Sequence, residues 1–267
     1  MPRLSRDEST LIALSDRSGQ VDVWLKDLRT GEERAVTATN TIERSPQVSD
    51  GGEKVFFGSR EGALYPIYVV NTRGGTPEKV CADCGTLSDI SPDGQYVLYH
   101  AGEPWSAYAF QIATGRQTLV GSKTRRIYGS RFSPDGKWIA FHTDTGGDDM
   151  PRQIFVAPFR PEMRIPEETW IPITAGSQSD FDVSWAADGA ELFFFSTRDG
   201  NRCIWATRLN PQTKEPVGAA FPVVHLHRFS AHAPDALGLG ISATDRRLVF
   251  GAMELSSTLF RIETAIR

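Results

Sequence analysis

The chain is short of cysteine, of long apolar runs and of clustered basic residues, and each shortage excludes a class of protein. Three cysteines in 267 residues are too few for a scaffold held together by disulfides. No apolar run approaches the roughly 18 residues of a membrane-spanning helix, so we expect no direct membrane insertion. The segment from Met1 to Glu8 also lacks the apolar core of a secretory signal.

The charge balance excludes another class. The sequence has 29 Lys and Arg against 33 Asp and Glu, a formal net charge of −4, with both signs scattered along the chain. Non-specific affinity for nucleic acid comes from clustered Lys and Arg, so we expect no nucleic-acid partner. A hydrophobic content of 40% is ordinary for a globular protein with a sizeable core.

What the sequence does contain is an internal repeat. A turn sequence, clearest as Ser-Pro-Asp-Gly at 91–94 and 133–136, is followed two residues later by a short apolar run. Weaker copies start at positions 5, 49, 186 and 242, which makes six. About twenty residues after each turn comes an aliphatic or small residue followed by an aromatic one. These pairs are Val23-Trp24, Ile67-Tyr68, Ala107-Tyr108, Ile154-Phe155, Ile204-Trp205 and Leu259-Phe260.

The turn residues have a structural explanation. Proline presets φ, aspartate accepts hydrogen bonds from nearby backbone, and glycine adopts the positive φ that a tight reversal requires. Because the same aspartate and glycine recur in one type of turn, we predict a structural and not a catalytic role for them. The residues concerned are Asp93, Gly94, Asp135, Gly136, Asp188 and Gly189.

Each repeat predicts one blade of a β-propeller. The runs beside the turns are rich in Val, Ile, Phe and Tyr and too short for helices, and further turns leave room for four strands per repeat. We therefore predict an all-β fold, a six-bladed β-propeller of four-stranded antiparallel blades, with the third-strand aromatics filling the gaps between blades. Residues 1–267 form one domain, with repeats at about 1–42, 43–84, 85–126, 127–178, 179–236 and 237–267.

The repeat resembles a known family. The Ser-Pro-Asp-Gly turn, the apolar strand, the Ser-Asp-Arg-like loops at 15–19 and 196–200 and the Ile-Tyr or Ile-Trp strand resemble the TolB-type, WD40-like propeller repeat of bacteria. That resemblance covers essentially the whole chain and implies a protein-binding role on the periplasmic or envelope side of a bacterium. Residues 191–227 also resemble propellers joined to bacterial kinases and winged-helix regulators, which implies a sensory role in a longer protein. The short first and last repeats likewise predict a fragment.

The candidate binding residues lie at the loops after second and fourth strands, on the face opposite the turns. They are His100, His142, Arg125, Arg126, His225, His227 and His232. His225 and His227 have a spacing that could hold a metal together with a carboxylate such as Asp144 or Glu103. Because the sequence shows no complete set of ligands, we predict ordinary hydrogen-bonding histidines, no metal site and no cofactor.

A single Cys-x-x-Cys, at Cys81 and Cys84, predicts a turn with free or paired thiols, since zinc sites of this type need two such pairs. The sequence has no Gly-x-Ser-x-Gly, His-Glu-x-x-His or phosphate-binding loop. We therefore predict a non-catalytic module that binds a protein, a peptide or a small polar ligand. The alternative is a six-bladed propeller hydrolase that uses a metal or carboxylates at the central channel.

Overall fold

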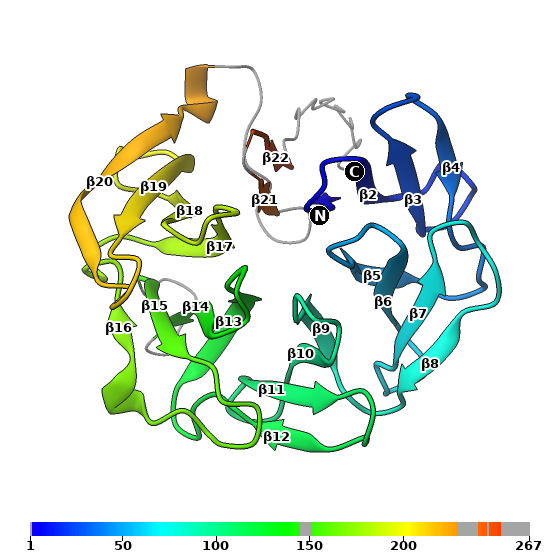
Figure 1. Cartoon of the computed structure of the whole chain (residues 1–267), viewed down its shortest axis with the longest axis horizontal. Helices are drawn as coiled ribbons and strands as arrows, with labels where there is room; N and C mark the ends of the chain where they lie inside the picture. The colour runs from blue at the N-terminus through cyan, green and yellow to red at the C-terminus, as the bar shows by residue number, and fades with distance from the viewer. Residues whose placement is uncertain (1, 145–150, 229–239, 245, 252–267) are drawn as a thin grey trace, which may run out of the picture.

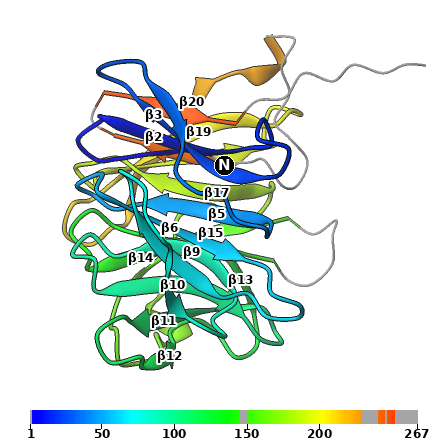
Figure 2. The same ribbon diagram turned by 90° about the vertical axis from the view of Figure 1, so that its right-hand side faces the viewer.

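The structure is a β-propeller in which antiparallel sheets surround a central axis (Figure 1). This computed structural model describes residues 2–144, 151–228, 240–244 and 246–251. Figure 2 shows that most strands run across the thickness of the ring, so that the strand ends and their loops lie on two opposite faces. Among the described residues, none belongs to a helix long and apolar enough to cross a membrane.

Five sheets have four strands each, paired in chain order from the axis outwards. Blade 1 contains β1 (Arg3–Leu4), β2 (Thr10–Ser15), β3 (Asp22–Asp27) and β4 (Glu33–Ala35). Blade 2 contains β5 (Glu43–Val48), β6 (Lys54–Ser59), β7 (Ile67–Asn71) and β8 (Glu78–Cys81). Blade 3 contains β9 (Thr86–Ile90), β10 (Tyr96–Ala101), β11 (Ser106–Gln111) and β12 (Gln117–Leu119). Blade 4 contains β13 (Arg126–Phe132), β14 (Trp138–Asp144), β15 (Gln153–Pro158) and β16 (Ile171–Pro172), with the 3-10 helix η1 (Glu167–Thr169) before β16. Blade 5 contains β17 (Asp180–Trp185), β18 (Glu191–Ser196), β19 (Cys203–Leu209) and β20 (Pro216–Val224), followed by η2 (Leu226–Arg228).

The predicted number of six four-stranded blades is wrong. The part of the sixth repeat that the structure describes forms a two-stranded sheet, β21 (Ile241–Ala243) and β22 (Leu248–Phe250). The prediction of six repeats was based on the turn and the strand that follows it. The sixth turn does join two paired strands, β21 and β22. Its third-strand pair, Leu259-Phe260, lies outside the described residues.

The recurring turn is held by its own side chains. In blade 3 the Ser91 hydroxyl donates to Asp93 Oδ1 at 2.6 Å and accepts from the Tyr96 backbone N–H at 2.8 Å. Gly94 has φ +69°, which an L side chain rarely adopts. Blade 4 repeats this arrangement at Ser133 and Asp135, with Gly136 at the same φ. In blade 5, Asp188 accepts from the Ala190 N–H and Gly189 again has φ +69°.

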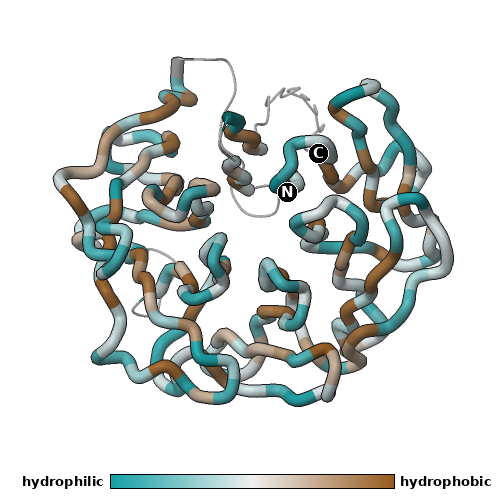
Figure 3. The backbone as a smooth tube through the Cα atoms, in the orientation of Figure 1, coloured by the Kyte–Doolittle hydropathy of each residue, from teal (hydrophilic) through white to brown (hydrophobic). Residues whose placement is uncertain are grey.

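The core lies between neighbouring blades, and the predicted place of the third-strand aromatics is confirmed in blades 2 to 5, where Tyr68, Tyr108, Phe155 and Trp205 pack into clusters shared with the preceding blade. In the third strands it is the aliphatic or small member of each pair that is fully buried, and Phe155 is the one aromatic member among blades 1 to 5 that is also buried. Successive residues of a strand face opposite sides, so the aromatic member turns to the other side and stacks on a second-strand ring, as Tyr68 does on Phe57 at 5.7 Å. Figure 3 shows the brown apolar segments within the strands and mostly teal loops at the rim. The buried members are Val23, Ile67, Ala107, Ile154 and Ile204.

The first and sixth repeats meet through side chains near the axis, beside the N-terminus in Figure 1. The Leu4 N–H donates to Ser242 Oγ at 3.0 Å, and on the other side the Ala243 N–H donates to Ser184 Oγ of blade 5 at 3.1 Å. Thr244 Oγ1 donates to the Glu8 carboxylate at 2.6 Å. The two described strands of the sixth repeat therefore fill the space between blades 5 and 1.

Candidate functional site: the central channel

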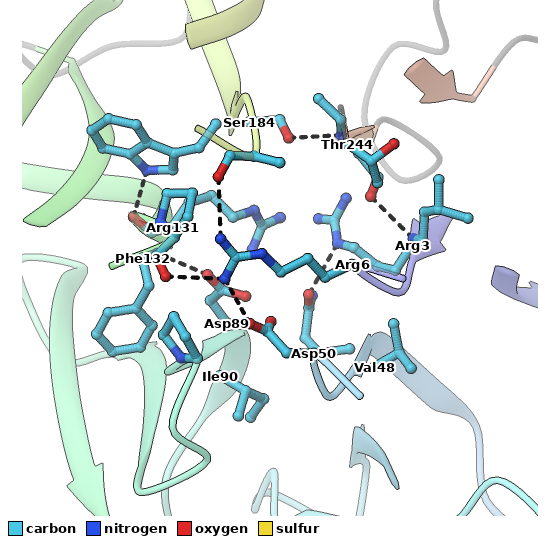
Figure 4. A pocket seen from close by; sticks show the side chains of 18 of the residues that line it. Arg3, Arg6, Val48, Asp50, Asp89, Ile90, Arg131, Phe132, Ser184 and Thr244 are labelled. Carbon is cyan, nitrogen blue, oxygen red and sulfur yellow. Dashed lines mark hydrogen bonds and ion pairs between the residues drawn. The ribbon is translucent and has the colours of Figure 1, made fainter. Parts of the chain in front are cut away.

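Polar side chains occupy one equivalent position of the innermost strand in five blades. This position lies two residues before the first residue of each turn, and an apolar residue separates it from the turn. Together these side chains line a cavity of about 140 Å³ on the axis of the ring (Figure 4). From blade 1 to blade 5 they are Arg3, Gln47, Asp89, Arg131 and Ser184.

β-Bulges in the innermost strands help to position this ring of side chains. The register shifts between Arg44 and Gln47, between Tyr128 and Arg131, and between Phe181 and Ser184. Bulges bend a strand and redirect the side chains that follow, and they are frequent beside functional sites. The residue four positions before the turn adopts a positive φ in blades 2, 4 and 5, namely at Ser45, Gly129 and Asp182.

Arg6 lies across the mouth of the channel on the turn face (Figure 4). Its Nη1 is 3.2 Å from Asp50 Oδ2 in the turn of blade 2 and 3.2 Å from the Pro134 carbonyl oxygen in blade 4, while Nη2 donates to the Ala187 carbonyl in blade 5. The Arg6 and Asp50 side chains are 45% and 42% exposed. An exposed ion pair of this kind contributes only about 0–1 kcal/mol, so the two carbonyl contacts share in holding Arg6 over the mouth.

Arg3 lies deeper in the channel and is buried. Its Nε donates to Gln47 Oε1 at 3.0 Å and its Nη1 to the Ile241 carbonyl at 3.0 Å. The third nitrogen, Nη2, is buried and has no hydrogen-bond partner among the described residues. Burial lowers the pKa of Arg3, while the charges of Asp182 and Asp89 raise it. A buried guanidinium with an unused donor is a site for an acceptor group.

The charges of two buried carboxyl groups act on Arg3: Asp89, which lines the channel, and Asp182, four positions before the turn of blade 5. Burial raises the pKa of Asp89 to about 7. The Phe132 N–H, which donates to Asp89 Oδ2 at 2.8 Å, and the charge of Arg3 both lower this pKa but do not offset the effect of burial. Burial also raises the pKa of Asp182, whose Oδ2 is buried without a partner among the described residues. Arg131 is buried as well and donates from Nη1 to the Ser88 carbonyl. Burial thus favours the neutral form of both carboxyl groups beside the guanidinium groups of Arg3 and Arg131.

Asp89→Asn should raise stability at high pH. The folded-state pKa of Asp89, about 7, exceeds the value of about 3.9 for an unfolded chain, so its contribution to stability is greatest in acid and is lost as the pH rises towards 7. Asparagine keeps an oxygen for the Phe132 N–H but does not ionise. We expect the variant to gain about 2–3 kcal/mol on wild type between pH 5 and pH 8, measured by urea unfolding. Parallel pH profiles for the two proteins would contradict the buried position of this carboxyl.

The structure places His100 and His142 away from any open face. Both are buried, and burial lowers the pKa of each to about 3. His100 Nε2 lies 3.0 Å from Ser130 Oγ in blade 4, and His142 Nδ1 accepts from the Asp182 N–H in blade 5 at 3.4 Å. These histidines connect one blade to the next.

The two arginines of the predicted basic cluster occupy different settings. The Arg125 guanidinium donates to Thr143 Oγ1 at 2.8 Å and lies over the Phe155 ring at 5.1 Å. Arg126 begins β13, and a hydrogen bond with Tyr128 raises its pKa. The structure does not bring these arginines to the channel.

The remaining candidates are divided between blade 5 and the undescribed part of the chain. His225 and His227 lie close together at the end of β20, with their rings 5.2 Å apart, whereas His232 lies outside the described residues. Cys81 and Cys84 form a disulfide. None of the six predicted binding residues that the structure describes lines the channel cavity.

The channel residues were missed although a signal was present. The position two residues before the turn is polar in five successive repeats, inside a strand that packs on both sides. Alignment of the repeats on their turns would have revealed this column, because the innermost strands of a propeller converge on one axis. Its five members are Arg3, Gln47, Asp89, Arg131 and Ser184.

Sequence comparison alone identifies neither a family nor a function for this chain. No protein-family model matches the chain. A curated but uncharacterised protein of Agrobacterium fabrum, Atu1656, is 27% identical over 198 residues, which is 71% of this chain and 63% of that protein. The chain thus spans less than two thirds of the length of this relative.

Solved structures identify the fold. A TolB-type protein from Agrobacterium tumefaciens superposes with a TM-score of 0.67 at 19% identity, over 83% of this chain and 78% of its own. TolB from Acinetobacter baumannii gives 0.63 at 15% identity, over 78% of this chain and 51% of its own. The chain has a TolB-like β-propeller fold. The resemblance predicted from the sequence is thereby confirmed.

The TolB-like fold does not by itself specify a function. An oligogalacturonate lyase from Vibrio parahaemolyticus has a TM-score of 0.56 at 16% identity, over 82% of this chain and 64% of its own. Propellers of this kind therefore occur in enzymes as well as in TolB proteins, and function must be argued from the site.

Proposed function

We propose that this TolB-like propeller is a non-catalytic binding module that receives a carboxylate of a peptide or protein partner in its central channel. The observation that carries the proposal is the buried guanidinium of Arg3, a residue that lines the channel and whose Nη2 has no hydrogen-bond partner among the described residues. A carboxylate accepts charge-assisted hydrogen bonds from such a group, with two parallel bonds as the favoured geometry.

The remaining charges support an anionic ligand. Arg131 and Arg6 line the same cavity, so its lining has three guanidinium groups and two carboxyl groups, Asp50 and Asp89, and burial raises the pKa of Asp89. Each guanidinium group contributes to a positive field that is concentrated between low-dielectric walls. The partly exposed Arg6 at the mouth would rotate aside or pair with the ligand.

The size of the cavity supports a peptide over a free small molecule. A volume of about 140 Å³ is below the roughly 300–1,000 Å³ of sites that enclose whole ligands. It suits one acidic side chain or a chain terminus, while the rest of the partner lies on the turn face. Loops on a rigid scaffold commonly carry such contacts.

Selection from a random peptide library displayed with free carboxyl termini tests this proposal. We expect enrichment of Asp, Glu or a free terminus, and at least about a tenfold loss of affinity for Arg6→Ala and Arg3→Met, equal to about 1.4 kcal/mol. Arg116→Met is the matched control, because Arg116 is an exposed arginine on the outer part of blade 3, paired with Glu162. Amidation of the selected peptide's carboxylates should abolish binding.

Several outcomes would count against the channel. They are selected peptides without carboxylates, equal binding by Arg6→Ala and wild type, or loss of binding in Arg116→Met. Arg3 also contacts Gln47 of blade 2 and Ile241 of the sixth repeat, so thermal melting of Arg3→Met is measured alongside. If Arg3→Met unfolds, the exposed change Arg6→Ala decides the question.

A second candidate function, hydrolysis or related chemistry at the same channel, is favoured by one observation. Asp89 has a pKa of about 7, which suits a general acid or base near neutral pH. Assay of wild type and Asp89→Asn against lactones, glycosides and oligogalacturonates tests this function. Turnover by wild type that is absent in Asp89→Asn would support catalysis, and no turnover on any substrate would leave the binding function.

A further inference from the structure

Four potential metal ligands gather in blade 5, away from the channel. Asp199 lies in the loop after β18, Cys203 begins β19, His225 follows β20 and His227 lies in η2. One ligand atom of each side chain lies within 4.8 Å of all the others. Within the described ranges, this is the one group of three or more His, Cys, Asp or Glu side chains arranged in this way.

The contacts within the group resemble a coordination shell. Cys203 Sγ is 3.2 Å from His227 Nδ1, and His225 Nδ1 is 2.9 Å from Asp199 Oδ2. His227 Nδ1 is 4.0 Å from Asp199 Oδ2. Zinc bonds of about 2.0–2.3 Å in a tetrahedron separate the ligand atoms by about 3.3–3.8 Å. Small side-chain rotations therefore bring all four atoms to a common centre.

The donor set selects the type of cation. One sulfur, two imidazole nitrogens and one carboxylate oxygen suit zinc and its neighbours in the transition series, whereas calcium and magnesium take oxygen ligands. Cys203 is fully buried, which shields the sulfur. His227 is exposed and the Asp199 and His225 side chains are partly exposed, so a cation can enter from solvent.

The same geometry disfavours a Cys-His nucleophile. In a catalytic dyad supported by a carboxylate, the thiol and the carboxylate contact opposite nitrogens of the imidazole. Here Cys203 and Asp199 both face Nδ1 of His227. Atoms that converge on one point, as these do, are arranged for a shared cation and not for a proton relay.

We propose that Asp199, Cys203, His225 and His227 form a tetrahedral site for zinc or a similar divalent transition metal. On binding, the Cys203 thiol releases its proton to solvent and both imidazoles coordinate as neutral rings. The site joins the β18–β19 loop to the segment after β20, and so clamps the outer edge of blade 5. It is independent of the peptide-binding function proposed for the channel.

Titration of the metal-free protein with Co²⁺ tests the site. We expect one equivalent to bind, with a sulfur-to-cobalt charge-transfer band in the near ultraviolet and intense visible bands typical of tetrahedral cobalt, and Zn²⁺ to displace it. Cys203→Ser should abolish the charge-transfer band, and His227→Gln or Asp199→Asn should weaken binding at least about tenfold. The double variant Cys81→Ser, Cys84→Ser is the matched control and should leave the spectrum unchanged, because these sulfurs lie in blade 2.

Two results would overturn the proposal. One is the absence of stoichiometric cobalt binding to wild type, and the other is a charge-transfer band that persists in Cys203→Ser and disappears in the Cys81, Cys84 double variant. His227→Gln changes an exposed side chain and should fold normally. Its loss of metal, with an unchanged circular dichroism spectrum, separates ligation from misfolding.

Discussion

Replacement of His100 by glutamine and His142 by asparagine is expected to remove about 3 kcal/mol of acid destabilisation for each histidine at pH 4. In the folded chain burial lowers both pKa values to about 3, from about 6.5 in an unfolded chain. Below pH 6.5 both histidines are therefore protonated in the unfolded state, whereas in the folded state they stay neutral down to about pH 3. The stabilising effect is complete above pH 6.5 and is lost at about 1.4 kcal/mol per histidine per pH unit as the pH falls.

The substitutions are chosen to keep the hydrogen bonds. Glutamine places a polar group where His100 Nε2 meets Ser130 Oγ, and asparagine places an oxygen where His142 Nδ1 accepts from the Asp182 N–H. Urea unfolding at pH 7, 6, 5 and 4 gives the free energy of unfolding for both proteins. The difference between their profiles should have a slope of about 2.7 kcal/mol per pH unit.

Comparison of the two proteins is needed because carboxyl groups act in the opposite direction. Burial raises the pKa of Asp89 to about 7, so protonation of Asp89 stabilises the folded chain as the pH falls from 7. Asp182 acts in the same sense. Wild type alone can thus show a nearly flat profile. Identical profiles for wild type and the double variant would show that these imidazoles are not buried.

Gly85→Ala should destabilise the protein by about 3 kcal/mol or more. Gly85 connects blades 2 and 3 with φ +120°, and a Cβ there would lie 2.5 Å from the His100 carbonyl oxygen and 3.1 Å from Ala101 Cβ. A backbone oxygen cannot move without disturbing the β9–β10 pairing. The strained φ adds about 1–3 kcal/mol to this overlap.

Gly75→Ala is the matched control. Gly75 has φ +127°, but a Cβ there meets no atom within 4 Å. Gly75→Ala should therefore lower the free energy of unfolding only by the cost of the positive φ, about 1–3 kcal/mol. Thermal or urea unfolding of the two variants then separates the steric overlap at Gly85 from the backbone strain that both sites share. Equal losses of stability at the two sites would show that the loop before β9 yields to the added methyl group.

The fold was predictable because its signals are local and recur. The Ser91 to Gly94 turn carries its hydrogen bonds within six residues, and the apolar strands follow at a fixed distance. The channel was not predictable in this way. Arg3 and Arg131 are 128 positions apart, and only closure of the ring places them around one cavity.

The blade 5 cluster shows the same limit. His225 and His227 stood out by their spacing, but Asp144 and Glu103 were named as the partner carboxylates. The structure instead places the two histidines beside Asp199, which lies in the Ser-Asp-Arg-like loop at 196–200. Cys203 is the first residue of β19, and its sulfur lies 3.2 Å from His227 Nδ1. Strand pairing, which the sequence does not reveal, brings these segments together.

The contact between repeats 6 and 1 has a consequence for how the molecule comes apart. All four strands of blade 1 come from the first repeat, and the described bonds to the sixth join side chains to backbone or to other side chains, as at Leu4 and Ser242 or at Glu8 and Thr244. Arrays of repeats gain stability from nearest-neighbour interfaces. A ring that opens at this seam becomes a linear array with two free ends, and it loses blades one after another. Amide exchange should accordingly be fastest at this seam and slowest in blades 3 and 4, opposite it.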